Sequence, residues 1–494
     1  MIPNDSFLLR SRKSQIHRFH LAAAAALGLA LLAGCGGGGS GTTTVLQGST
    51  NVVLLASSTA NDQLVQFPLT LSSLTLTTRG GRTATVFSSP LSAEYIHLNG
   101  NVEPLVSVSI PQAVYTSATA TYGGTAPVCV GAPSSSSGLL IDGALNGPGK
   151  PTVTVNLPEP ITVTGKAMGL VLNLQVSASA PFTGACAENL SVPVSPVFNL
   201  TPLTIAAQPT SSANGMAYGL QGTVTSVDAD GSSFTVTAPV GYWNGNAPVW
   251  QVSAGSSTSF QGIGSAAGLV AGMPVDMDLA LQPDGSLLAT RVAVYDTDAT
   301  NLSLGIGQAI SPGYVSSSIN ALTSQVVGEL SSLSDVYIYA SASSQISTQF
   351  TNLQSLPFPA TFTAATTLPG QNLLIASNAP PVGGYPPLPL PIATMALMPQ
   401  TINGTVSAIS TSGSFTVYTV TLAPYDVLAE LANQSGEPTE ASPGTVVVYA
   451  DSSTQMLNSS AVAVGSVVRF YGLLFNDSGT LRMDCAQVND GVTE

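Results

Sequence analysis

Two carboxylates in this chain have a spacing that suits acid–base chemistry. Asp276 and Asp278 lie two residues apart in a run of strand-forming residues. Because residues i and i+2 of a β-strand project from the same face, both carboxylates should share one face of a sheet. Such a pair can supply the acid and the base of a hydrolytic reaction. The simpler interpretation, which the pattern favours, is two solvated side chains on an exposed strand.

Histidine is nearly absent. His17 and His20 lie in the N-terminal segment, so His97 is the only one further along the chain. A Ser-His-Asp or Cys-His arrangement would have to use His97, and the chain has no Gly-x-Ser-x-Gly motif. A zinc site needs three or more ligands, and the cysteines are widely spaced. We therefore predict a strand or turn position for His97, with no catalytic residue, no metal and no cofactor.

Three aromatic residues, Tyr242, Trp243 and Trp250, flank an Asn-Gly-Asn turn. Exposed rings on a β-sheet can stack on sugar rings, which makes these residues candidates for ligand binding. The favoured alternative is that the large rings close the core of a small domain. Nearby, Asp228-Ala229-Asp230-Gly231 begins like a calcium loop but lacks the later ligands, and we interpret it as a hairpin turn.

The first 34 residues have the layout of a secretory signal peptide. Four basic residues precede the apolar stretch from Leu21 to Leu32, which is too short to span a bilayer stably. Small residues follow, in the run Leu32-Ala33-Gly34-Cys35. We predict export and cleavage at this point.

The run that ends at Cys35 resembles the lipobox of bacterial lipoproteins. The resemblance implies a diacylglycerol on the Cys35 thiol, cleavage before this residue, and a further acyl chain such as palmitate on the new amine. Together these chains would anchor the protein stably in a membrane. Gly36 follows the cysteine where aspartate commonly marks retention in the inner membrane. The resemblance therefore implies a location in the cell envelope, with the outer membrane favoured.

Charge excludes one class of partner. Only 7% of residues are charged, and the formal net charge is −14. Removal of residues 1–34 takes away four basic residues and one acidic residue, which leaves −17. An acidic chain without a basic aromatic patch repels phosphate backbones, so nucleic acid is not an expected partner. Expected partners are the membrane, through Cys35, and a glycan or another envelope protein.

Three cysteines remain besides Cys35. Cys129 and Cys186 lie between strand-like segments and could form a disulfide in an oxidising compartment. It would close a loop of about 58 residues and stabilise the fold by about 4 kcal/mol. Two buried free thiols are the alternative. Cys485 is then unpaired, and we expect a buried thiol in a terminal strand.

Short runs rich in Val, Leu, Thr and Ser alternate with Gly, Pro, Asn and Asp, which predicts an all-β chain. After the signal at 1–34 we expect a Gly/Thr tether at 35–44 and a β-sandwich domain at 45–210. The sandwich segment, with Ile110-Pro111-x-x-x-Tyr115, resembles a domain of unknown function near the N-terminus of bacterial lipoproteins. That family implies a transthyretin-like sandwich.

The rest of the chain is repetitive. The hairpin opening that starts at Gly222 recurs at Gly404, 182 residues later, with a glycine turn and an inward Phe each time. These motifs resemble a small β-barrel domain of unknown function, often found in tandem in exported bacterial proteins. We predict units at 219–297, 298–400 and 401–490, with short helical insertions at Ile319 to Leu330 and Asp426 to Asn433.

These features predict a lipid-anchored protein of the cell envelope with a binding or structural role and no catalysis. The alternative is a carbohydrate-active or other hydrolase that works through strand carboxylates such as Asp276 and Asp278.

Overall fold

The structure is a computed structural model. It describes residues 46–59, 62–64, 67–99, 101–125, 127, 130–131, 139–140, 144–145, 152–181, 193–210, 212–238, 243–245, 247–294, 303–311, 314–320, 324–329, 335–338, 353–362, 371–377, 390–391, 394–397, 399–424, 426, 428–429, 444–457 and 462–490. Nearly all of the secondary structure in these ranges is strand, so the all-β prediction is confirmed. Cys35, Cys129 and Cys186 lie outside them.

The first part of the chain forms two sheets. One sheet has four strands in the order β13-β11-β1-β5. Its members are β1 (Ser49–Ser58), β5 (Glu103–Pro111), β11 (Ala167–Leu174) and β13 (Phe198–Leu203). β1 runs parallel to β11, whereas its pairing with β5 is antiparallel.

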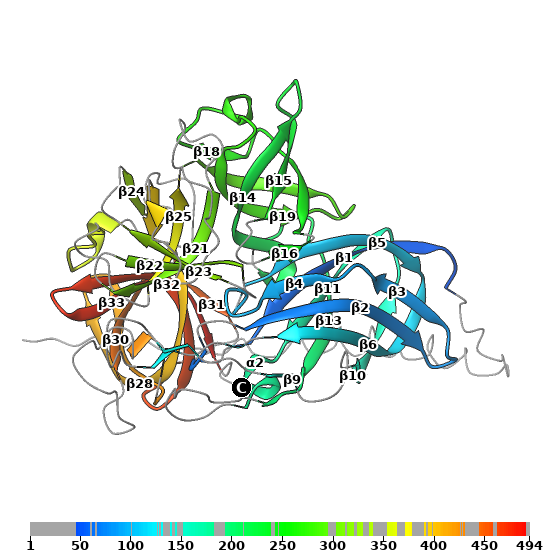
Figure 1. Ribbon diagram of the computed structural model, residues 1–494, viewed down its shortest axis with the longest axis horizontal. Helices are drawn as coiled ribbons and strands as arrows, with labels where there is room; N and C mark the ends of the chain where they lie inside the picture. The colour runs from blue at the N-terminus through cyan, green and yellow to red at the C-terminus, as the bar shows by residue number, and fades with distance from the viewer. Residues whose placement is uncertain are drawn as a thin grey trace, which may run out of the picture. The chain divides into compact units, whose positions relative to one another are not determined.

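The second sheet has the order β10-β6-β2-β4-β16, and β3 also pairs with β2 (Figure 1). Its strands are β2 (Pro68–Thr78), β3 (Thr83–Phe87), β4 (Leu91–Glu94), β6 (Ala113–Thr125), β10 (Thr152–Val163) and β16 (Trp243–Gly245). Gly80 and Gly81 lie in the turn between β2 and β3, and Gly81 has a φ of 80°. The Tyr115 hydroxyl donates to the Pro111 carbonyl at 2.8 Å, which gives a physical reason for the Pro-x-x-x-Tyr spacing.

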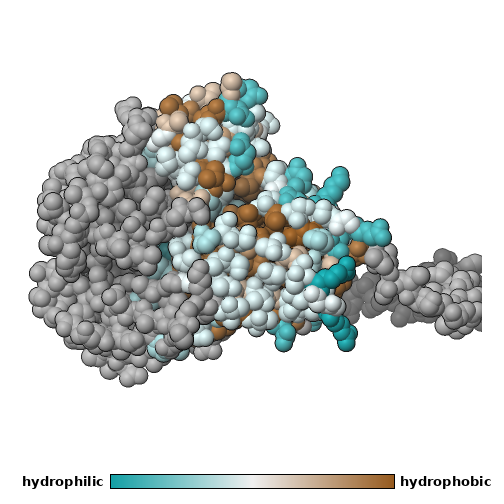
Figure 2. All heavy atoms as spheres, turned by 45° about the vertical axis from the view of Figure 1, so that its right-hand side comes forward, coloured by the Kyte–Doolittle hydropathy of each residue, from teal (hydrophilic) through white to brown (hydrophobic). Residues whose placement is uncertain are grey.

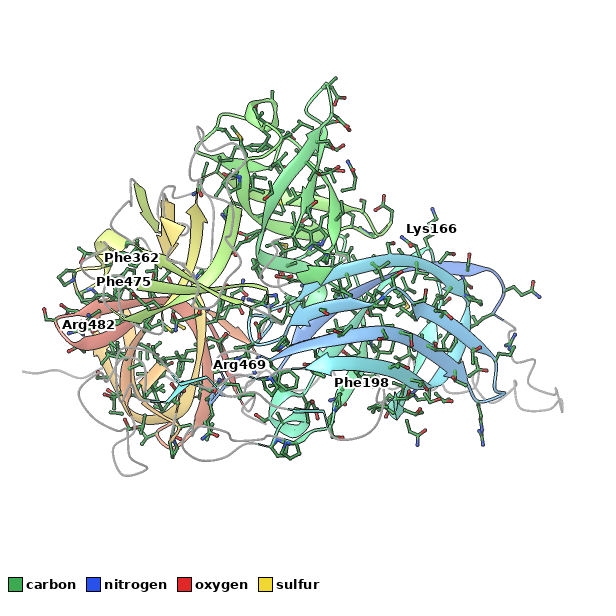
Figure 3. The ribbon with its side chains drawn as sticks, viewed as in Figure 1. Lys166, Phe198, Phe362, Arg469, Phe475 and Arg482 are labelled. Carbon is green, nitrogen blue, oxygen red and sulfur yellow. The ribbon has the colours of Figure 1, made fainter. Side chains whose placement is uncertain are left out.

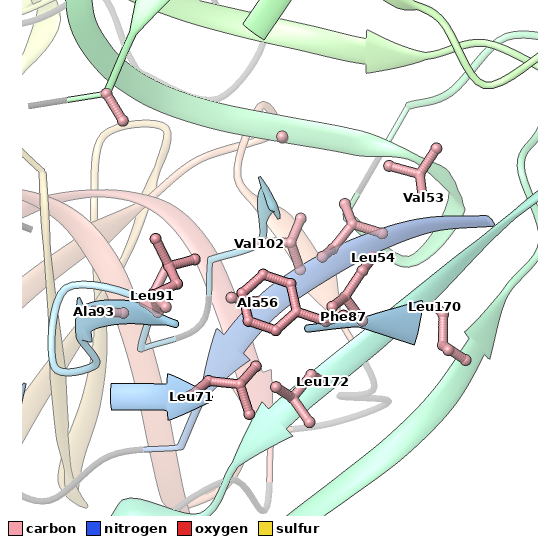
Figure 4. Close-up of a cluster of buried hydrophobic side chains, with 14 of the residues drawn as sticks. Val53, Leu54, Ala56, Leu71, Phe87, Leu91, Ala93, Val102, Leu170 and Leu172 are labelled. Carbon is pink, nitrogen blue, oxygen red and sulfur yellow. The ribbon is translucent and has the colours of Figure 1, made fainter. Parts of the chain in front are cut away.

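Apolar residues from both sheets fill a common core. Leu54 and Ala56 from β1, Leu71 from β2, and Leu170 and Leu172 from β11 are all buried in one cluster (Figure 4). β2 and β11 alternate along much of their length between buried and more exposed residues, as strands do when one face covers a core, whereas β1 is buried on both faces from Val52 to Ser58. This arrangement is a β-sandwich.

Residues 216–293 form a small closed sheet. The order is β17-β15-β14-β19-β20-β18, and pairing of β17 with β20 closes a ring like that of a barrel. The strands are β14 (Met216–Val227), β15 (Ser233–Thr237), β17 (Val249–Ser253), β18 (Ser259–Gln261), β19 (Pro274–Leu281) and β20 (Leu287–Ala293). We call this sheet the first barrel. Asp228 to Gly231 forms its predicted hairpin turn, where Asp230 accepts a hydrogen bond from the Ser232 N–H.

Residues 400–490 repeat this topology. Their order is β30-β29-β28-β32-β33-β31, closed by pairing of β30 with β33. The strands are β28 (Gln400–Ser412), β29 (Phe415–Leu422), β30 (Thr445–Ala450), β31 (Gln455–Leu457), β32 (Val467–Asp477) and β33 (Thr480–Asp490). We call this sheet the third barrel.

The middle sheet has the order β24-β27-β25-β21-β22-β23-β26. Without β26, this order matches that of the other two barrels strand for strand. Its members are β21 (Ser303–Ser311), β22 (Tyr314–Asn320), β23 (Ser324–Glu329), β24 (Asp335–Ile338), β25 (Asn372–Ser377), β26 (Leu390–Pro391) and β27 (Thr394–Leu397). The predicted helix from Ile319 to Leu330 is wrong, because this segment contributes to the β22–β23 hairpin.

A few short elements complete the described chain. They are β7 (Val130–Gly131), β8 (Leu139–Leu140), β9 (Ala144–Leu145), β12 (Pro193–Val194), α2 (Val176–Ser179), η1 (Ser212–Asn214), η2 (Ala266–Gly268) and η4 (Leu353–Ser355). Leu428 and Ala429 are helical, within the second predicted helical insertion.

The repeated glycines have a steric cause. A Cβ atom on Gly222 would lie 2.5 Å from the Thr237 carbonyl oxygen, and one on Gly404 would lie 2.5 Å from that of Thr421. Both glycines therefore let the first hairpin of a barrel close tightly. A register shift also follows each glycine at the same offset, after Val224 and after Val406.

Candidate functional site

The two carboxylates predicted to share a face do so, and both bind one arginine. Arg291 donates from Nε to Asp278 Oδ2 at 2.9 Å and from Nη2 to Asp278 Oδ1 at 3.1 Å. The same Nη2 also donates to Asp276 Oδ1. Asp276 and Asp278 lie on β19, and Arg291 lies on the adjacent β20, directly opposite Asp278. Two neighbouring strands thus place one cation between two anions. Figure 3 draws the described side chains and labels Arg469, a second arginine, which lies in the third barrel.

This group lies inside the protein. Asp276 and Arg291 are fully buried, and Asp278 is 3% exposed. The prediction of solvated strand residues is therefore wrong. The cause is that every residue of β19 is buried, so neither face of this strand meets solvent. A buried ion pair with bidentate geometry fixes register and conformation, whereas a hydrolytic acid–base pair must reach its substrate.

The third barrel has a polar group at the corresponding register position. In the first barrel Gln221 pairs with Asp276, and in the third Asn403 pairs with Arg469. Arg469 Nε donates to Asn403 Oδ1 at 3.4 Å, and Asn403 Nδ2 donates to Asp62 Oδ1 at 2.5 Å. The first and third barrels thus both bury a charge at this position, and the residues that hydrogen-bond to it differ.

Burial dominates the electrostatics of this second group. It lowers the pKa of Arg469 to about 10, and the nearby Asp62 carboxylate opposes that change. Burial also raises the pKa of Asp62, which Asn403 and Arg469 partly offset. Tyr471, two residues after Arg469, has a pKa raised first by burial and then by the charge of Asp276. The charge of Asp276 in the first barrel therefore adds to the effect of burial on a tyrosine of the third barrel.

His97 belongs to a third buried group. It lies in the turn after β4, and its Nδ1 is 3.3 Å from Glu94 Oε2 while its Nε2 is 3.5 Å from Glu103 Oε1. Burial lowers the pKa of His97, but attraction to Glu103 and Glu94 outweighs this and raises it to about 9. Glu94 also accepts the backbone N–H groups of Phe67 and Ile96. A protonated His97 therefore links Glu94, the last residue of β4, to Glu103, the first residue of β5.

The two tryptophans proposed for ligand binding lie in different sheets of the structure. Trp250 is 3% exposed, and its Nε1 donates to the Pro104 carbonyl at 2.8 Å. A ring buried in this way cannot stack on a sugar from solvent, so the packing alternative applies to Trp250. Trp243 lies in β16, which pairs with β4 of the sandwich, and Tyr242 lies outside the described residues.

The remaining predicted sites concern cysteines and membranes. Cys485 is a buried free thiol in β33, and burial together with Asp484 raises its pKa. Among the residues that the structure covers, no three His, Cys, Asp or Glu side chains are grouped to hold a metal ion. Within the same ranges, no helix has the length and apolar character needed to cross a membrane.

In all three groups the sequence pattern did not reveal the partner residues. Arg291, Arg469, Glu94, Glu103 and Asp62 were not assigned roles. One signal was available, because only 7% of the chain is charged and a lone charge inside an apolar strand is then unusual. A charged residue inside an apolar strand therefore predicts a buried residue of opposite charge next to it.

Comparison with known proteins assigns one segment. Residues 221–293 match the family model described as a domain of unknown function, DUF5666, so the first barrel contains a DUF5666 domain. The Asp276–Asp278–Arg291 group lies within it. A search of curated proteins gave no match. Among solved structures, the chain titled "drosophila Unr CSD456" matches at 11% identity, over 56% of this chain and 97% of that chain, with a TM-score of 0.13. A score this low supports no inference.

Proposed function

We propose that this chain is a lipid-anchored protein of the bacterial cell envelope whose β-domains bind or support other envelope components without catalysis. The Leu32-Ala33-Gly34-Cys35 run and the glycine-rich segment after it support anchoring through Cys35. Gly36 supports the outer membrane as the location. The transthyretin-like relationship of residues 45–210 belongs to the same proposal, through the lipoprotein family that this segment resembles.

One observation carries the non-catalytic part of the proposal. The acidic pair with the best spacing for acid–base chemistry, Asp276 and Asp278, is buried around Arg291. His97 is likewise held between Glu94 and Glu103. These groups stabilise a fold that has few other charges. The hydrolase alternative would need the same carboxylates at an accessible surface.

Replacement of Cys35 by Ser tests the anchor. The wild-type chain should fractionate with membranes and incorporate a labelled fatty acid, because acylation requires the thiol. The C35S variant should lose the label and leave the membrane fraction. Ser40→Ala, in the predicted tether, is the matched control and should behave as wild type. A C35S chain that is still processed and membrane-bound would contradict the proposal.

Replacement of Asp276 by Asn tests the absence of catalysis. The wild-type protein should not turn over a panel of glycoside and ester substrates. Turnover that disappears in a folded Asp276→Asn variant would support the hydrolase alternative instead. Near-ultraviolet circular dichroism would establish that the variant is folded.

A further inference from the structure

One face of the second sandwich sheet carries threonines in rows. Four adjacent strands, β3, β2, β6 and β10, each contribute a Thr-x-Thr motif to it. The motifs are Thr83 and Thr85, Thr75 and Thr77, Thr119 and Thr121, and Thr152 and Thr154. The register places Thr85, Thr75, Thr119 and Thr154 side by side in one row across the four strands. We call these eight side chains the threonine face.

The opposite face of these strands fixes the direction of the threonines. Leu74, Leu76, Ala118 and Ala120 are fully buried, and they alternate with the threonines along β2 and β6. Since successive side chains of a strand point to opposite sides, the threonines point away from the core. The four on the outer strands β3 and β10 are exposed, and the four on β2 and β6 are partly exposed.

Four of the eight threonines, those on β6 and β10, are paired by side-chain hydrogen bonds. Thr119 Oγ1 lies 3.0 Å from Thr154 Oγ1, and Thr121 Oγ1 lies 3.4 Å from Thr152 Oγ1. A β-branched side chain in a strand also has few χ1 rotamers. Binding through these groups therefore loses little side-chain entropy. The sheet repeats them at about 4.8 Å between strands and about 6.8 Å along a strand.

The threonine face is neutral. None of its eight side chains is charged, and the nearest charges in sequence lie at the ends of strands, as with Arg79 and Arg82 in the β2–β3 turn. Figure 2 colours the surface by hydropathy: on the coloured part of the face that it presents, residues of intermediate hydropathy lie beside hydrophobic patches, and the strongly hydrophilic residues lie mostly near the edges. A charged polymer would find no counter-charge among the threonines.

We infer that the threonine face binds a neutral polysaccharide. Each hydroxyl both donates and accepts, so a regular array complements a chain whose own hydroxyl or amide groups repeat. One such hydrogen bond adds only about 0.5–1.5 kcal/mol, so affinity must come from several rows engaged together. An extended polymer meets this condition, whereas a single sugar would touch one row. The inference rests on the proposed binding role and names the class of ligand.

The test is retention of the full chain, in detergent extract, on insoluble cellulose and chitin. Wild type should be retained on at least one of them. A triple variant, Thr75→Val with Thr119→Val and Thr154→Val, should lower retention at least about tenfold, because valine keeps the shape of threonine and removes the hydroxyl. Serine at the same three positions keeps the hydroxyls and should restore most of the retention.

A row of three threonines in the third barrel, Thr405, Thr421 and Thr445, provides a matched control. Valine at these positions should leave retention unchanged. The inference is overturned if wild type binds neither polymer, if both valine variants lose binding equally, or if only an anionic polysaccharide retains the chain. It is also overturned if the face acts on ice growth without binding either polymer. Fractionation of the C35S variant is independent of all these results, so a failure of anchoring can be told apart from a failure of binding.

Discussion

Arg469 in the third barrel occupies the register position that Asp276 occupies in the first. Val275 pairs with Gly222 in the first barrel, and Val468 pairs with Gly404 in the third. Asp276 and Arg469 are the residues that directly follow these valines, and both glycines are sites where a Cβ atom would clash. The two positions carry opposite charges, and both are buried. A buried charge at an equivalent position of two repeats indicates a common structural role. The residues that bind the charge differ, since Asp276 contacts Arg291 and Arg469 contacts Asn403.

Removal of Arg291 should destabilise the first barrel severely. An Arg291→Met variant leaves Asp276 and Asp278 buried without their cation, and the expected loss is about 3–5 kcal/mol. Urea unfolding followed by tryptophan fluorescence measures it, because Trp250 is buried in the same barrel. Arg79→Met, at an exposed turn, is the control and should cost less than about 1 kcal/mol. Equal midpoints for the two variants would show that the buried group is dispensable.

Alanine at Gly222 or at Gly404 should strain the first hairpin of its barrel. In both cases the added methyl group would press against a carbonyl oxygen of the paired strand, so we expect a loss of about 1–3 kcal/mol. Gly264 has open space around its Cβ direction, and Gly264→Ala should be nearly neutral. Thermal melting of the three variants decides between these outcomes. Unchanged melting of Gly222→Ala would refute the steric explanation.

The His97 group should stabilise the sandwich at neutral and acidic pH and lose its effect in alkali. The pKa of His97 is about 9 in the folded chain, above its ordinary value of 6.5, so protonation favours the folded state. This stabilisation is fully present below about pH 6.5 and disappears as the pH rises through about 9. The difference in urea midpoint between wild type and His97→Gln should therefore shrink over this window. A difference that stays constant would mean that His97 does not titrate there.

Cys485 should resist alkylation in the native protein. Its thiol is fully buried, and burial with the neighbouring Asp484 raises its pKa, so both access and thiolate formation are hindered. Iodoacetamide should label the Cys485 peptide only after unfolding, as measured by mass spectrometry. Rapid labelling without denaturant would contradict the buried position.

Much of the sandwich and of the two outer barrels could be predicted from alternation and turn residues. The alternating runs predict an all-β chain, and the Gly222 and Gly404 motifs both open barrel hairpins. These features depend on neighbours in sequence, so one chain reveals them. The spacing of apolar residues from Ile319 to Leu330 fits a helix as well as a hairpin, so spacing alone does not distinguish the two, and the segment contributes to the β22–β23 hairpin.

The buried groups could not be predicted in the same way. Contact between Asp276 and Arg291 depends on the register of β19 against β20, which shifts after Asp278. The Asp62–Asn403 hydrogen bond joins residues 341 positions apart. The spacing of residues along a strand predicts which of them share a face. Whether that face is buried depends on a second strand or loop that is distant in the sequence.

β16 has a consequence for how this chain can be divided. It lies between β15 and β17 of the first barrel, yet it pairs with β4 of the sandwich, and a single apolar cluster includes residues of both. A fragment cut between residues 210 and 219 would leave β4 with an open edge and expose core side chains, so it should aggregate. The family match covers residues 221–293 alone, whereas these contacts predict that the first barrel and the sandwich fold together, so the two should be expressed on one chain.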